Sequence, residues 1–157
     1  NVDDPVVLKR LVGLLTEFSR AVPLVFSLHP RTRERLAQAA IPLPESPQFR
    51  VIPPLGYRDN LRMIQCAKMV LTDSGGIQEE TSALNVPCLT LRDTTERPIT
   101  VTLGSSELVG NDAGRIREAW GRFQAGQWKQ ASPIPLWDGH TAERIAKRLF
   151  EVWGVGT

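Results

Sequence analysis

The sequence is poor in the residues that mark several common classes of protein. Its 157 residues include two cysteines, two histidines and one tyrosine, and aromatic residues make up only 6%. Two cysteines are too few for a scaffold held by disulfides, so we expect Cys66 and Cys88 to be small core residues in a reducing environment. No apolar stretch is long enough to cross a bilayer, and we find no signal peptide. We therefore expect a cytoplasmic protein without a membrane partner.

The charge of the chain is nearly balanced. Its 19 Lys and Arg residues against 17 Asp and Glu residues give a formal net charge of +2, and no five consecutive residues are basic. This balance argues against nucleic acid as a partner. Hydrophobic residues make up 41% and charged residues 23%, as in ordinary globular proteins, and the length suits one domain.

Short apolar segments alternate with segments whose apolar residues recur at helical spacing. Apolar strands separated by helices are typical of a parallel sheet covered on both faces. The pattern predicts an α/β protein with a Rossmann-like, doubly wound parallel sheet. The predicted strands are residues 24–28, 49–52, 68–72, 86–91 and 107–109, and the predicted helices are residues 5–22, 32–40, 60–67, 74–84, 96–103, 113–125 and 141–153.

The segment TDSGGIQEE, residues 72–80, lies between a predicted strand and a predicted helix. The first N–H groups of a helix have no internal partner and attract phosphate, and glycines let the phosphate approach the backbone. Ser74, Gly75 and Gly76 therefore suit a phosphate, and Glu80 suits the hydroxyls of a ribose. The alternative is a Ser-Gly-Gly turn that merely begins a helix, with Glu79 and Glu80 favouring its first turn.

Two other segments follow predicted strands. In the first, RDTTERP, Arg92 and Arg97 suit anionic oxygens, although Thr94 or Thr95 can equally cap a helix there. In the second, HPR, His29 is placed to face a ligand cleft, although a lone histidine is more often a structural residue.

Several segments together resemble one family, the bacterial non-hydrolysing UDP-N-acetylglucosamine 2-epimerases. They are SLHPRTR, PPLGYRDNL, LTDSGGIQEE, PCLTLRDTTERP, LVGND and DGHTAERI, in that order along nearly the whole chain. The resemblance implies the C-terminal, UDP-binding domain of a GT-B-type fold over residues 1–157, with the N-terminal catalytic domain absent. It also implies an isomerase, used in cell-surface polysaccharide biosynthesis, that binds UDP or a UDP-N-acetylhexosamine without a cofactor or a metal.

The resemblance also assigns roles to residues. It implies that catalytic residues lie in the missing N-terminal domain, with His29 the only candidate in this chain. The aromatic residue that the family usually places near the uracil is replaced here by Asn60. The implied UDP-binding residues are Ser74, Gly75 and Gly76 for the diphosphate, Glu80 for the ribose, the backbone around Leu55 and Gly56 for the uracil, and Arg97 for the nucleotide.

The resemblance further implies that the chain lacks the first strand of its domain, because Asn1 matches the end of the motif that follows this strand. That strand is central in a doubly wound sheet, so we expect unpaired strand edges that invite pairing with another chain, a second copy included. Two alternative functions share the expected fold. One is the donor-binding domain of a GT-B UDP-sugar glycosyltransferase, and the other is a non-catalytic UDP-binding module.

Overall fold

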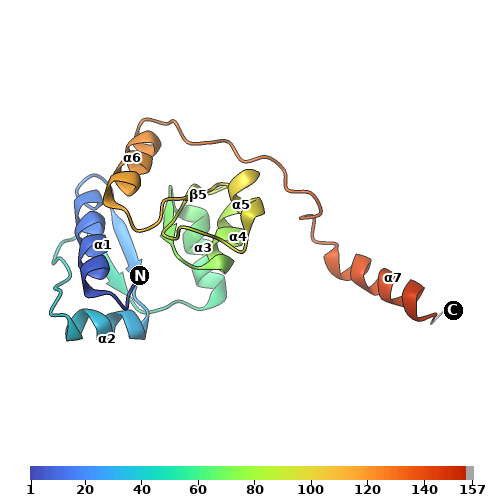
Figure 1. Ribbon diagram of the computed structural model, residues 1–157, viewed down its shortest axis with the longest axis horizontal. Helices are drawn as coiled ribbons and strands as arrows, with labels where there is room; N and C mark the ends of the chain where they lie inside the picture. Colours follow the sequence, from blue (N-terminus) through green and yellow to red (C-terminus); the bar gives the residue numbers. More distant parts are fainter. Residues whose placement is uncertain (155–157) are drawn as a thin grey trace.

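The computed structural model describes residues 1–154, which form seven helices and five short parallel strands (Figure 1). The α/β class predicted from the sequence is confirmed. The strands are β1 (Leu24–Ser27), β2 (Phe49–Ile52), β3 (Val70–Thr72), β4 (Cys88–Thr90) and β5 (Ser106–Leu108). The helices are α1 (Pro5–Phe18), α2 (Pro30–Gln38), α3 (Tyr57–Cys66), α4 (Gly75–Ala83), α5 (Pro98–Thr102), α6 (Ala113–Gln124) and α7 (Thr141–Trp153).

Two helices begin earlier than the sequence predicts. Helix α2 starts at Pro30, because His29 caps it by accepting a hydrogen bond from the backbone N–H of Arg31 at 3.2 Å. Helix α3 starts at Tyr57 after Gly56, without a side-chain cap. Cys66 lies in the last turn of α3 and is exposed, so the prediction that it is a core residue is wrong. Cys88 is buried as predicted.

The strands form two parallel sheets that do not pair with each other in the described residues. One has the order β1-β2 and the other the order β3-β4-β5. The expectation of unpaired strand edges is thus confirmed. Val25, in the middle of β1, is 48% exposed, whereas all three residues of β4 are buried. Strand β1 of the smaller sheet is therefore partly exposed to solvent, whereas β4, the central strand of the larger sheet, is covered.

Helix α1 joins the two sheets through two neighbouring apolar clusters. Phe18 and Leu14 of α1 pack with Leu89 of β4 and with α6, and Phe18 stacks on Trp120 with ring centroids 4.5 Å apart. Another face of α1 packs on Leu28 and on α2. Burying these side chains stabilises the fold by about 1.5–3 kcal/mol each. The two sheets are therefore held together by a helix rather than by a shared strand.

A layer of buried polar side chains lies between α4 and the larger sheet. Side chains alternate in direction along a strand, so Leu89 faces α1 and α6 while its neighbours on β4 face α4. This polar layer consists of Gln78, Thr81 and Ser82 of α4, Cys88 and Thr90 of β4, and Ser106 of β5. Its hydroxyls bond partly to the helix itself, as Thr81 does to the carbonyl of Ile77 at 2.8 Å. Helix α4 thus packs on the larger sheet through small polar side chains.

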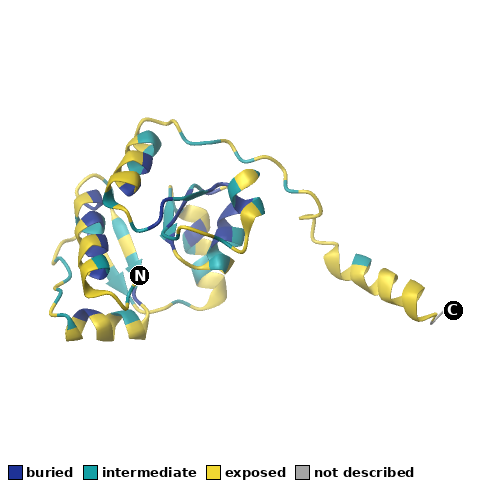
Figure 2. Cartoon of the chain, in the orientation of Figure 1, coloured by how far each residue is buried: buried dark blue, intermediate teal, exposed yellow. Residues whose placement is uncertain are grey.

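Helix α7 projects from the rest of the protein at the end of an extended segment (Figure 1). None of its residues is buried, and Figure 2 shows it almost wholly exposed. Its apolar side chains include Ile145, Leu149, Phe150 and Trp153, which are 42–72% exposed. Within residues 1–154, no helix combines the length and the apolar character that a membrane span requires.

Candidate functional site

The candidate site is the junction of β3 and α4, which the segment TDSGGIQEE forms. The backbone N–H of Ser74 donates to Thr72 Oγ1 at 3.1 Å, which fixes the turn between strand and helix. Ser74 is the N-cap residue, yet its side chain makes no capping hydrogen bond. The Ser74 hydroxyl and the first N–H groups of α4 are therefore available as donors at the positive end of the helix dipole.

Neither glycine of this turn is required by the fold. Gly75 and Gly76 are helical, and a Cβ atom at either position would meet its nearest neighbour at 3.9 Å, an ordinary contact distance. Glycine in a helix is less stable than alanine by about 0.5–1 kcal/mol. Two successive glycines are therefore a cost to the fold that packing does not explain. They leave the backbone without side chains at the point where the first N–H groups of the helix are free to donate.

Glu80 lies one turn into α4 and is half-buried. Its Oε2 atom is buried and has no hydrogen-bond partner among the described residues. Burial raises the pKa of the Glu80 carboxyl, and the neighbouring charge of Glu79 raises it further. An acceptor oxygen in such a position suits a ligand that brings hydroxyl donors.

The segment after β4 packs against α4 and completes the site. Gln78, which is fully buried, accepts a hydrogen bond from Thr95 Oγ1 at 2.7 Å. Arg97 is paired with Glu79 of α4 through an Nε–Oε1 distance of 2.9 Å. Arg97 thus lies beside the predicted phosphate turn, but its guanidinium is held by an acid of the same helix.

Sequence reasoning missed Gln78 and Glu96. Glu96 pairs with Arg92, and its Oε2 atom lies 3.9 Å from the position that a Cβ of Gly75 would take. Gln78 shares the buried face of α4 with Thr81 and Ser82, and this polar inward face gives no amphipathic signal. The spacing of Arg92 and Glu96, four residues apart, is the one clue that the sequence contained.

Other predicted residues belong to other elements. The backbone carbonyl of Gly56 accepts the N–H of Asn60 in the first turn of α3 at 2.9 Å, and no side chain caps that turn. Leu55 is partly buried beside it. His29 is exposed and caps α2, which is the structural role that the sequence left open. Of the predicted UDP-binding residues, the structure places Ser74, Gly75, Gly76, Glu80 and Arg97 on or against α4.

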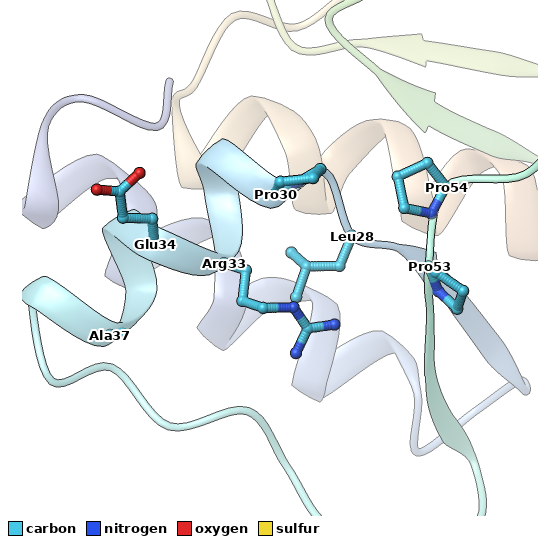
Figure 3. A pocket seen from close by; sticks show the side chains of 7 residues that line it. All are labelled: Leu28, Pro30, Arg33, Glu34, Ala37, Pro53 and Pro54. Atoms are coloured by element: carbon cyan, nitrogen blue, oxygen red, sulfur yellow. The ribbon is translucent and has the colours of Figure 1, made fainter.

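A separate cavity of about 440 Å³ lies at the ends of β1 and β2 (Figure 3). Its walls are Leu28, Pro53, Pro54 and the α2 residues Pro30, Arg33, Glu34 and Ala37. Figure 3 shows the Arg33 side chain extending from α2 toward Leu28. The cavity contains none of the predicted UDP-binding residues. Within residues 1–154, no group of three or more His, Cys, Asp or Glu side chains is arranged to hold a metal ion.

The sequence model of the UDP-N-acetylglucosamine 2-epimerase family matches residues 1–150. A UDP-N-acetylglucosamine 2-epimerase of Methanocaldococcus jannaschii is 38% identical over 157 residues, covering 95% of this chain and 41% of that protein. A UDP-2,3-diacetamido-2,3-dideoxy-D-glucuronate 2-epimerase of Pseudomonas aeruginosa is 37% identical, covering 97% of this chain and 42% of that protein.

Solved structures show the same relation. The crystal structure of the M. jannaschii UDP-GlcNAc 2-epimerase in complex with UDP-GlcNAc and UDP matches with a TM-score of 0.83 and 37% identity. The match covers 96% of this chain and 42% of that one. The chain therefore spans about two fifths of the length of these relatives.

Proposed function

The chain belongs to the UDP-N-acetylglucosamine 2-epimerase family, and on that premise we propose that it is the C-terminal, UDP-binding half of such an enzyme. The whole enzyme would interconvert UDP-N-acetylglucosamine and UDP-N-acetylmannosamine. A relative solved with UDP-GlcNAc and UDP supports this ligand class. The remaining three fifths of the relatives' length would supply the other domain.

The observation that carries the proposal is the pair of glycines at the start of α4. Because neither packing nor backbone conformation requires glycine there, their value to the protein lies in what can approach the backbone. Ser74 adds a hydroxyl donor, and the helix N-terminus adds free N–H groups. Together they make a cradle for the diphosphate of UDP.

Glu80 supports the same ligand. A diphosphate held at Ser74, Gly75 and Gly76 would extend toward a ribose one helical turn away. The buried Oε2 atom of Glu80 lacks a donor among the described residues, and two vicinal hydroxyls would supply one. Leu55 and Gly56 at the start of α3 would read the uracil through their backbone, and Asn60 would replace the family's aromatic residue.

The chemistry that this half would supply concerns the leaving group. In the proposed reaction a base removes the proton from carbon 2, the bond from carbon 1 to the UDP oxygen breaks, and UDP leaves with the electron pair. Fixed donors at the helix N-terminus would stabilise the charge that develops on UDP. Acid and base groups on opposite faces of carbon 2 would come from the other half. UDP then adds back after protonation on the opposite face.

The sugar itself would be selected mainly by the other half. The P. aeruginosa relative is named for a diacetamido glucuronate rather than for N-acetylglucosamine, although it matches this chain nearly as well as the M. jannaschii relative does. Both named substrates are UDP sugars. UDP, which these two substrates share, is therefore the part of the ligand that this chain is proposed to hold.

Calorimetry with Gly76→Val tests the proposal. We expect the variant to lose most of its UDP affinity because the valine side chain blocks the backbone, while folding suffers only the helix-propensity cost. Gly121→Val in α6 is the matched control, since Gly121 is also helical and a Cβ there meets nothing within 4 Å. Unchanged UDP affinity in Gly76→Val, together with a sharply lower melting temperature, would make the glycine structural.

Incubation in deuterated water tests whether the catalytic acid and base lie outside this chain. The chain alone should incorporate no deuterium at carbon 2 of UDP-N-acetylglucosamine above a control without protein, because one face of the sugar lacks a base and water quenches exposed charge. Incorporation that His29→Ala abolishes would place the catalytic residue in this chain instead.

A further inference from the structure

An ion pair lies beside the N-terminus of α4. Arg92 follows β4, and its Nη2 atom lies 3.1 Å from Glu96 Oε1, while Nη1 donates to Glu96 Oε2 at 3.4 Å. Hydrogen bonding to Arg92 lowers the pKa of the Glu96 carboxyl, so the side chain is ionised at neutral pH. The pair thus brings one fixed anion and one fixed cation to the candidate site.

The anion of this pair lies beside the residue that is proposed to receive phosphate. Glu96 Oε2 lies 3.9 Å from the position of a Cβ on Gly75, the first residue of α4. A carboxylate near a helix N-terminus is favoured by the helix dipole, as a phosphate is. Glu96 therefore lies where the helix attracts an anion, and it also neutralises Arg92.

We infer that Glu96 competes with the diphosphate for Arg92 and for the N-terminus of α4, so that the Arg92–Glu96 pair sets the affinity of the site. This inference rests on the proposed UDP site. When UDP binds, the Glu96 carboxylate turns away and the Arg92 guanidinium takes a phosphate in its place. Arginine suits this exchange because its planar fork matches carboxylate and phosphate oxygens alike.

The surroundings allow such an exchange by side-chain rotation. The Glu96 side chain is 67% exposed, so it can move into solvent without displacing a neighbour, whereas the Arg92 side chain is 33% exposed. The backbone between them is anchored, because Thr95 bonds to the buried Gln78 and also accepts the N–H of Arg97 at 3.0 Å. Only the two side chains have to change partners.

Neutralising each member of the pair separately tests the inference. Titration calorimetry would compare UDP with uridine, which lacks phosphates, on the wild-type chain, Glu96→Gln and Arg92→Gln. We expect Glu96→Gln to bind UDP roughly three- to fivefold more tightly, a size typical of exposed charge pairs, and Arg92→Gln to bind it more weakly. Uridine affinity should stay unchanged in both variants.

The opposite signs distinguish competition from a structural role. A pair that merely holds the loop in place would weaken UDP binding in both variants, and that result would overturn the inference. Glu151→Gln is the matched control, because it makes the same charge change in an exposed ion pair on α7, where Arg148 and Glu151 are 3.1 Å apart. An equal gain in this control would also overturn the inference. A wild-type chain that binds neither UDP nor uridine would instead contradict the proposed function.

Discussion

Helix α4 has nine residues, and three of them, Gln78, Thr81 and Ser82, are buried, whereas none of the thirteen residues of α7 is buried. The two helices also differ in what surrounds them. The inward face of α4 is polar and already packed on β4 and β5, while α7 exposes an apolar face to solvent (Figure 2). The position of α4 is therefore determined within this chain, and that of α7 is not.

This difference fits the role that we propose for α4. A helix that must present backbone donors to a ligand needs a fixed position, and the packing of α4 on β4 and β5 supplies it. An exposed apolar helix face marks a surface that associates with something else. The site of UDP binding should thus be complete enough to work in the chain alone, while α7 should contribute little to it.

The largest expected difference between the two regions is in stability. Leu89→Ala removes a fully buried side chain from the cluster between β4, α1 and α6, and should lower the free energy of unfolding by about 2–5 kcal/mol. Leu149→Ala makes the same change on α7, where the leucine is 42% exposed, and should cost less than about 0.5 kcal/mol. Urea unfolding of both variants measures this, and equal losses would show that α7 packs against the rest of the chain.

The next effect concerns UDP affinity. Glu80→Ala should weaken UDP binding by about 1.5–3 kcal/mol, because it removes the carboxyl acceptor from the ribose hydroxyls. Glu143→Ala on α7 is a control, since that acid pairs with His140 far along the chain. Calorimetry on both variants checks the prediction, and unchanged affinity in Glu80→Ala would remove Glu80 from the site.

A smaller effect should appear in the dependence of stability on pH. Because burial raises the pKa of Glu80, the folded chain keeps this proton to higher pH than the unfolded chain does. The contribution of Glu80 to stability therefore falls as pH rises from the ordinary carboxyl range to the raised value. Glu80→Gln should raise the melting temperature at pH 7, and the gain should shrink on acidification. A variant that melts below the wild type at pH 7 would contradict this account.

The sequence predicted the order of elements because the pattern of apolar residues in this chain is clear. The strand at residues 49–52 and the helix at residues 141–153 have the predicted bounds. The caps at His29 and Gly56 were missed, since a histidine cap and a cap without a side chain leave weak signals. The exposure of Cys66 depends on which face α3 turns inward, which a short helix does not reveal.

The candidate site was predicted in part. Ser74, Gly75, Gly76 and Glu80 lie on one continuous segment, so a strand followed by a helix was enough to place them together. The ion pair of Arg97 with Glu79 and the position of Glu96 beside Gly75 join segments that are separate in the chain. Such contacts depend on the packing of β4 beside β3, which local pattern does not give. The placement of Leu55 and Gly56 around a uracil stays a prediction.

The amide resonances of the isotopically labelled chain, followed during titration with UDP, show whether α4 holds the diphosphate. We expect the largest shifts at Gly75 and Gly76, smaller ones as far as Glu80, and no change in α7. Uridine alone should reproduce the shift near Glu80 and leave the resonances of the two glycine amides almost unchanged. Shifts confined to the cavity beside Leu28 and Pro54, or no saturable shift at the two glycines, would contradict the claim that α4 holds the diphosphate.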